Sequence, residues 1–276
     1  MSDPKQYTIE PFFLPFGQES LFCLFLAPAA GNPRAAVLYL PPFAEEMHKS
    51  RRMAALQARQ LAQAGYAVLQ IDLLGCGDST GDFEDASWEN WLACARTAHD
   101  WLKQKTEGDI VLWGLRLGAT LAAQLSSLLP RIAGLVAWQP VANGESFLNQ
   151  FLRIRVASEM FADRKTGTKE LRGQLNVGEA VEVGGYMLAP ALASGIDKLR
   201  LAQLAIPAPV FWLEVSPTPG AQPSPASLKV IDSWVASGVQ VSAQTIVGDS
   251  FWATQEITEC PGLLVETLKA MQTLAP

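Results

Sequence analysis

The chain has 276 residues, of which 49% are hydrophobic and only 17% are charged. This composition excludes a disordered chain and favours a well-filled core, either one large α/β domain with an insertion or two small domains. The formal net charge of −6 provides no basic field for a nucleic-acid partner. No apolar run reaches the roughly 18 residues of a membrane span, and residues 1–10 are polar, so we expect no signal peptide.

The cysteines and histidines further limit the disulfide bonds and metal sites that the chain can form. The four cysteines form no Cys-x-x-Cys pair and indicate reduced thiols, mostly packed in apolar segments of a cytoplasmic protein; they are Cys23, Cys76, Cys94 and Cys260. The two histidines, His48 and His99, are too few for a histidine-rich metal site. We therefore expect no metal and no cofactor.

The first half of the chain alternates apolar runs with amphipathic segments. It predicts an N-terminal hairpin, and then strands and helices in turn: strands 7–15, 20–27 and 35–40, helix 49–64, strand 66–72, helix 88–105, strand 110–113, helix 117–129 and strand 132–138. Ser87 is placed to cap the helix 88–105, whose Trp88, Trp91 and Trp101 repeat at helical spacing and are expected in the core. Connections long enough for right-handed crossovers predict a mainly parallel twisted sheet with helices on both faces.

The alternation of strands and helices lapses from residue 144 to residue 200. This segment is expected to be an inserted cap, and residues 1–143 and 201–276 are expected to form the core. The sheet resumes with strand 209–215, helix 228–236, strand 239–247 and helix 261–274. A basic cluster in the cap is expected either to recruit an anionic ligand or to form a solvated face; it comprises Arg153, Arg155, Arg164, Lys165, Lys169 and Arg172.

The most informative motif is Gly114-Leu115-Arg116-Leu117-Gly118, which lies between a predicted strand and a predicted helix. It has the strand–turn–helix pattern of the nucleophile elbow of α/β-hydrolases, G-x-S-x-G, with Arg116 in place of the serine. A guanidinium cannot lose a proton near neutral pH and cannot attack a carbonyl carbon. The scaffold therefore points to one superfamily, and Arg116 argues against the usual chemistry of that superfamily.

The other positions of a catalytic triad are also incomplete. The acid is expected after the seventh strand, where Glu214 is the only carboxylate, and strand alternation is expected to bury it away from the site. The histidine is expected in the loop near residues 250–252, which contains Trp252 and no histidine. His48 is expected to be a surface or capping residue, and His99 to be structural. Acyl transfer by Ser-His-Asp needs both missing groups, so we expect no such catalysis.

The loop after the third strand retains the residues of an anion site. Backbone N–H groups of Phe43 or Ala44, together with that of Leu117, are expected to form an anion-binding pair at a helix N-terminus. Glu45 and Glu46 are candidates for a counter-charge to Arg116 or for a general base. The candidate catalytic residues are thus Arg116, Glu45 and Glu46, and the candidate ligand-binding residues are Arg116, Leu117, Phe43, Ala44, Asp78 and Trp252.

Asp78 has a second interpretation, because it follows the glycines of the turn at residues 75–79 and can fix that turn through an Asx-type bond. Those glycines do not make a dinucleotide-binding fingerprint, because Thr80 stands where the third glycine is needed. Arg116 also has two interpretations. It is either a clamp for a carboxylate, phosphate or sulfate, or a guanidinium held by internal carboxylates in a filled pocket.

Three strings carry a more specific resemblance: residues 41–53, residues 72–79 and residues 112–118. With them the chain resembles the exosortase A system-associated hydrolase 2 family, within the α/β-hydrolase superfamily. The resemblance implies a cytoplasmic protein of exopolysaccharide-producing Gram-negative bacteria, encoded near genes for polysaccharide synthesis and export-tag processing. The family pattern includes arginine at the elbow, and the name hydrolase does not establish a substrate.

Three functions follow as hypotheses. The first is a pseudo-hydrolase or accessory protein that holds a small anionic ligand at Arg116. The second is a non-standard hydrolase that acts on an ester, a thioester or an anionic sugar derivative through Arg116 and a nearby carboxylate. The third is an obligate partner of an enzyme of polysaccharide synthesis, with the cap as its contact surface.

Overall fold

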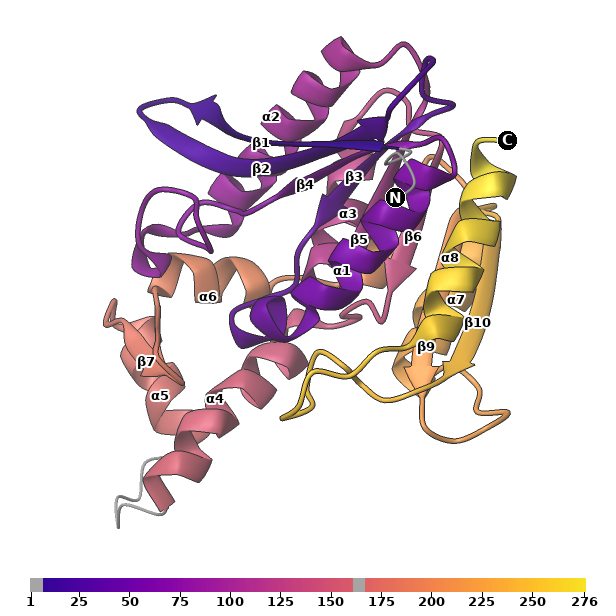
Figure 1. The fold of residues 1–276 in the computed structure, drawn as a ribbon. Helices are drawn as coiled ribbons and strands as arrows, with labels where there is room; N and C mark the ends of the chain where they lie inside the picture. The colour runs from indigo at the N-terminus through magenta and orange to yellow at the C-terminus, as the bar shows by residue number, and fades with distance from the viewer. Residues whose placement is uncertain (1–6, 161–166) are drawn as a thin grey trace.

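The computed structural model describes residues 7–160 and 167–276. Its main element is an eight-stranded sheet of order β1-β2-β4-β3-β5-β6-β9-β10 (Figure 1). The β1–β2 hairpin adds to β4 in antiparallel fashion, and every other neighbouring pair in this sheet is parallel. The bounds are β1 Tyr7–Phe16, β2 Glu19–Pro28, β3 Ala36–Leu40, β4 Ala67–Ile71, β5 Ile110–Leu115, β6 Gly134–Trp138, β9 Val210–Ser216 and β10 Val241–Val247. The mainly parallel sheet predicted from the sequence is confirmed.

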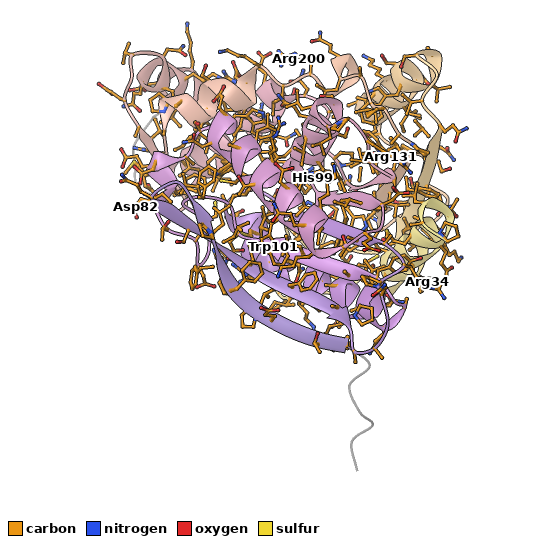
Figure 2. The ribbon with its side chains drawn as sticks, turned by 90° about the horizontal axis from the view of Figure 1, so that it is seen from above. Arg34, Asp82, His99, Trp101, Arg131 and Arg200 are labelled. Carbon is orange, nitrogen blue, oxygen red and sulfur yellow. The ribbon has the colours of Figure 1, made fainter. Side chains whose placement is uncertain are left out.

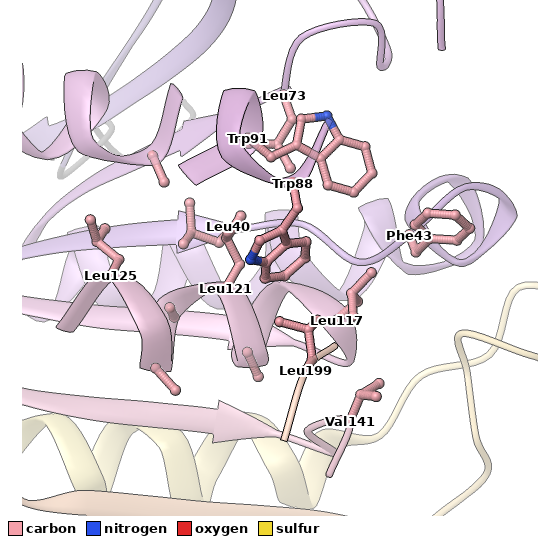
Figure 3. Packing of buried hydrophobic residues seen from close by; sticks show 14 of the residues in the cluster. Leu40, Phe43, Leu73, Trp88, Trp91, Leu117, Leu121, Leu125, Val141 and Leu199 are labelled. Atoms are coloured by element: carbon pink, nitrogen blue, oxygen red, sulfur yellow. The ribbon is translucent and has the colours of Figure 1, made fainter. Parts of the chain in front are cut away.

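Helices cover both faces of the sheet, which explains why the parallel strands are apolar almost throughout. On β3, Val37 and Tyr39 belong to one buried cluster, whereas Leu38 and Leu40 belong to the other. The first face carries α1 (Glu45–Gln63) and α8 (Pro261–Leu274), and the second carries α2 (Trp88–Lys105), α3 (Leu117–Leu128) and α7 (Pro225–Ala236). Figure 3 shows the second face, where Leu40 packs among side chains of α2 and α3.

Residues 144–200 lie between β6 and β9, and their described part, 144–160 and 167–200, contributes no strand to the main sheet. Figure 1 shows their helices grouped at one end of the molecule. They form α4 Gly144–Met160, α5 Thr168–Asn176, β7 Val181–Val183, β8 Tyr186–Leu188 and α6 Pro190–Asp197. The β7–β8 hairpin was not predicted, because three-residue strands are too short to show an alternating pattern. Two short 3₁₀ helices, η1 Phe83–Asp85 and η2 Leu201–Gln203, complete the described elements.

Most predicted element bounds agree with the structure to within two residues, and the two larger differences lie at helix starts. The helix 88–105 is capped as predicted, because the Ser87 side chain accepts a hydrogen bond from the Asn90 N–H. Helix α1 begins at Glu45, four residues before the predicted start, because the chain turns directly into the helix at Ala44. Helix α7 begins three residues early, at Pro225, because the Ser224 hydroxyl caps it.

The predicted core residues of α2 are found where expected. Trp88 and Trp91 are buried, and Trp101 is half-buried, stacked on Phe12 of the hairpin at a ring-centroid distance of 4.6 Å (Figure 2). The four cysteines are free thiols, and all except the half-buried Cys76 are buried. Within residues 7–160 and 167–276, no helix combines the length and apolarity that crossing a membrane requires.

Candidate functional site

Arg116 stands in a sharp turn between β5 and α3. Its backbone has φ 55° and ψ −122°, a left-handed conformation that only glycine adopts without strain. Two neighbouring glycines make this turn sterically possible. A Cβ atom on Gly114 would collide with the backbone of Gly118, and one on Gly118 would collide with the carbonyl oxygens of Leu40 and Pro41. The predicted elbow geometry is therefore present, and α3 starts in contact with the end of β3.

Two other residues share this strained backbone. Among the described residues, the non-glycine residues with positive φ are Ala44, Arg116 and Gln139, which follow β3, β5 and β6. These three parallel strands are neighbours, so all three residues lie at the carboxyl edge of the sheet, where ligands bind in open α/β folds. Each such residue costs about 1–3 kcal/mol, and strain of this kind clusters at functional sites.

The side chain of Arg116 forms an ion pair with Glu46 of α1. Arg116 Nε donates a hydrogen bond to Glu46 Oε1 at 2.9 Å, and the two side chains are only 18% and 15% exposed. Glu46 Oε2 is buried and has no hydrogen-bond partner among the described residues. Burial raises the pKa of Glu46 above its ordinary value, and the charge of Arg116 opposes this shift without cancelling it.

Two aromatic rings flank the guanidinium. Its central carbon lies 5.8 Å from the centroid of Phe147 on α4 and 5.7 Å from that of Trp252 in the loop after β10. Both distances fall within the range of cation–π attraction. Neither Nη group of Arg116 donates a hydrogen bond to a described residue. The guanidinium is thus fixed at its Nε edge and at its faces, while its two outer nitrogens keep their donor capacity.

A small cavity of about 100 Å³ lies beside this pair. Its charged wall is Arg116, Glu45 and Glu46, and its other wall comes from Phe43 and helix α4; the α4 residues are Phe147, Gln150, Phe151 and Ile154. Phe43 connects the loop after β3 with α4, because its ring packs edge-on against both Phe147 and Phe151, at centroid distances of 5.5 and 4.8 Å. Helix α4 therefore closes over the carboxyl edge of the sheet through aromatic contacts.

Two unpaired backbone donors occupy the turns at this edge. The N–H groups of Ala44 and Leu117 have no acceptor within residues 7–160 and 167–276. Both lie at helix starts, where unpaired N–H groups and the helix dipole favour an anion. Ala44 and Leu117 do not themselves line the cavity, although their neighbours Phe43 and Arg116 do.

The remaining candidate carboxylates either lie outside the cavity or pair with other groups. Glu45 borders the cavity and pairs with Lys49 at 3.8 Å on the exposed side of α1. Asp78 is exposed and does not line the cavity, and its N–H donates to the buried Asp72 carboxylate, at 3.0 Å. Glu214 is buried, as predicted, and accepts hydrogen bonds from Trp212 Nε1 at 2.8 Å and from a backbone N–H of the following loop at 3.1 Å.

Neither histidine reaches the cavity. His48 is exposed on α1, and His99 is buried on α2, where its Nδ1 lies 3.0 Å from the Asp100 carboxylate (Figure 2). Nor do three or more His, Cys, Asp or Glu side chains gather into a possible metal site in the part of the chain that the structure describes. The cavity thus combines a cation, two carboxylates and aromatic rings, without a nucleophile–histidine pair.

The described members of the basic cluster of residues 144–200 lie away from the cavity. Arg153 and Lys169 are exposed, and Arg172 is held by Asn149 and Asp197. Arg155 donates to a backbone carbonyl of β7. The other two members, Arg164 and Lys165, lie outside the described residues.

The α4 side chains of the cavity were missed in the sequence. Phe147, Phe151 and Ile154 recur at helical spacing, which indicates one apolar face of a helix but not the part of the protein that this face covers. Gln150, between the two phenylalanines, carries no pattern that would mark it as a cavity residue.

Comparisons with known proteins bear on the fold that carries this geometry. The family model of X-Pro dipeptidyl-peptidase (S15 family) matches residues 21–155, a range that contains the elbow and residues 41–48. No curated protein matches the chain. Among solved structures, Est1E from Butyrivibrio proteoclasticus with ferulic acid bound is similar over 96% of this chain and 98% of its own, with a TM-score of 0.68 at 17% identity.

Two further structures show the same likeness. A thermostable carboxyl esterase from Bacillus coagulans aligns over 98% of this chain and 99% of its own, with a TM-score of 0.67 and 12% identity. The α/β hydrolase GrgF from Penicillium sp. sh18 aligns over the same shares, with a TM-score of 0.65 and 16% identity. The chain has the α/β-hydrolase fold, as predicted, and at these identities the likeness establishes the fold without an activity.

Proposed function

We propose that this protein is a pseudo-hydrolase of the α/β-hydrolase fold that binds a small anion at Arg116. One observation carries the proposal: the elbow presents a guanidinium whose Nη groups are unpaired among the described residues and which lines a small cavity. Arginine is a strong anion ligand and cannot act as a nucleophile. The unpaired N–H groups of Ala44 and Leu117, at two helix starts beside the cavity, add donor capacity for an anion.

The wider role is proposed from the family resemblance in residues 41–53, 72–79 and 112–118. We place the protein in the cytoplasm, as an accessory protein of an exosortase-associated exopolysaccharide system. Its partner would be an enzyme of polysaccharide synthesis, with residues 144–200 as the contact surface. Co-purification from a host that carries such a system, with and without this segment's exposed Arg153 changed to glutamate, tests the partner.

Anion binding is tested by calorimetric titration with acetate, methyl phosphate and sulfate at constant ionic strength. The Arg116→Ala variant is expected to lose at least tenfold in affinity for whichever anion binds. Arg131→Ala is the matched control, because Arg131 is 78% exposed and pairs only at the surface. Binding of none of these anions to the unchanged protein, or equal loss in both variants, would refute the proposal.

The second candidate is a non-standard hydrolase, and the raised pKa of Glu46 favours it. A raised pKa makes the Glu46 carboxyl group a better proton acceptor than an ordinary glutamate, and Arg116 with the unpaired N–H of Leu117 can stabilise a developing oxyanion. This candidate predicts hydrolysis of p-nitrophenyl acetate or of an acyl thioester that falls at least tenfold in both Arg116→Ala and Glu46→Gln. Turnover at the background rate of buffer excludes it and leaves the binding proposal intact.

A further inference from the structure

The cavity beside Arg116 has two unlike walls, which together restrict its ligand. One wall is charged, and the other is built from the rings of Phe43, Phe147 and Phe151. Its uncharged polar side chain is Gln150. A ligand that fits must therefore carry its charge at one end and an apolar body at the other. A sugar ring, which needs polar partners around its circumference, finds few of them here.

The volume of the cavity limits the size of the enclosed group. At about 100 Å³, it is smaller than the roughly 150 Å³ cavity that holds a benzene molecule. A group of a few heavy atoms fits, such as a short acyl chain. A longer ligand must leave the cavity beside Ile154, which borders it and is 36% exposed.

The charges around the cavity distinguish between classes of anion. Arg116 already has Glu46 at 2.9 Å, and Glu45 lines the same cavity. An incoming anion therefore meets a guanidinium that Glu46 already neutralises, beside a second carboxylate, Glu45, that pairs with Lys49 at 3.8 Å. A phosphate monoester carries about −1.5 to −2 charges at neutral pH, so both its attraction to Arg116 and its repulsion by Glu46 are nearly twice those of a carboxylate. Because Glu46 already neutralises Arg116, the net attraction does not offset the larger cost of removing the doubly charged group from water. The two free Nη groups present a planar edge that pairs with a carboxylate or with a phosphate, so the discrimination between them comes from Glu46 and the apolar wall.

From these contacts we infer that the cavity takes the carboxylate end of a short apolar monocarboxylic acid, and that it discriminates against phosphate monoesters. This inference rests on the proposed anion site at Arg116 and narrows its ligand. Arg116 binds the carboxylate through its Nη groups, the aromatic wall holds the acyl chain, and Glu46 excludes a doubly charged group.

The test compares butyrate with methyl phosphate by calorimetry on the unchanged protein at pH about 7.5, where the two charges differ. Butyrate is expected to bind at least tenfold more tightly, and adding hydroxyl groups to its chain is expected to weaken binding. Methyl phosphate binding as tightly as butyrate overturns this inference while the anion site at Arg116 stands. If neither anion binds, the inference fails, and the anion site at Arg116 fails with it when acetate and sulfate do not bind either.

Two variants test the role assigned to Glu46. Glu46→Gln removes one carboxylate charge and is expected to improve methyl phosphate binding about tenfold relative to butyrate. Glu266→Gln is the matched control, because Glu266 pairs with Lys269 on α8, away from the cavity. The role of Glu46 is overturned if the ratio of the affinities for butyrate and methyl phosphate is equal in both variants and both show native near-ultraviolet circular dichroism. Should Glu46→Gln fail to fold, the comparison on the unchanged protein still decides the ligand class.

Discussion

Replacing Arg116 with methionine should destabilise the protein in a manner that depends on pH. The substitution keeps an apolar chain against Phe147 and Trp252 but leaves the carboxylate of Glu46 without its counter-charge. Breaking a buried ion pair costs about 3–5 kcal/mol, and a surface pair is worth about 0–1 kcal/mol. Because the two side chains are 18% and 15% exposed, we expect a loss of about 3 kcal/mol at pH 8.

The sign of the pH dependence follows from Glu46. Burial raises its pKa in the folded state, and Glu45 raises it further, whereas Arg116 and Lys49 lower it. Between the ordinary glutamate pKa and the raised one, the folded state binds more protons than the unfolded state, so stability rises as pH falls. Without Arg116 the pKa of Glu46 in the folded state rises further, so the pH range in which the folded state binds more protons than the unfolded state widens. The deficit of Arg116→Met should therefore shrink by at least about 1 kcal/mol from pH 8 to pH 5.5.

Urea unfolding followed by tryptophan fluorescence measures both quantities. The double variant Arg116→Met/Glu46→Gln is the control, because it has no buried carboxylate at this position; it should be more stable than Arg116→Met at pH 8 and should lose the pH dependence. A deficit below about 0.5 kcal/mol at pH 8, the size of an ordinary surface change, would refute the reasoning. So would a deficit that is equal at both pH values.

Three further predictions concern the elbow and the helix that covers it. Arg116→Ser should leave hydrolysis of p-nitrophenyl acetate at the background rate, because no histidine lines the cavity; a tenfold increase would contradict this. Gly118→Ala should cost about 3 kcal/mol in urea unfolding, because its Cβ would meet two backbone oxygens. The matched helical control Gly173→Ala has open space and should gain about 0.5–1 kcal/mol; equal effects would contradict the prediction. Phe43→Ala should cost about 3 kcal/mol and speed hydrogen exchange in α4, and unchanged exchange there would exclude its role in holding α4.

The sheet and its helices could be predicted because their signals are local. Strands buried on both faces are apolar runs whatever surrounds them, and β3, β5 and β6 are of this kind. The starts of α2 and α8 were predicted where Ser87 and Pro261 mark them, whereas the start of α7 was missed by three residues although Ser224 and Pro225 carry the same signals. The start of α1 was not predictable in this way, because Ala44 provides no side-chain cap.

The candidate site was predictable only in part, because its remaining features depend on tertiary contacts. The motif located Arg116, and the neighbouring sequence offered Glu45 or Glu46 as its counter-charge without deciding between them. In the structure Glu46 forms the ion pair with Arg116, and Glu45 pairs with Lys49. That choice depends on where α1 begins, since a shift by one residue rotates a helix by about 100°. The aromatic wall depends on how α4 docks, which no local pattern specifies.

Several features at this edge of the sheet lower the stability of the fold, and this loss argues for a pocket that serves binding. A buried ion pair is often no more stable than two apolar side chains of the same volume. Arg116 and Glu46 therefore stabilise the fold no more than hydrophobic side chains of the same volume would, and Glu46 Oε2 has no hydrogen-bond partner among the described residues. Arg116 and Ala44 also hold strained backbone conformations, at about 1–3 kcal/mol each. A site that served only to fill space would gain stability by losing each of these features, whereas a site that holds an anion needs the guanidinium and the turn that presents it.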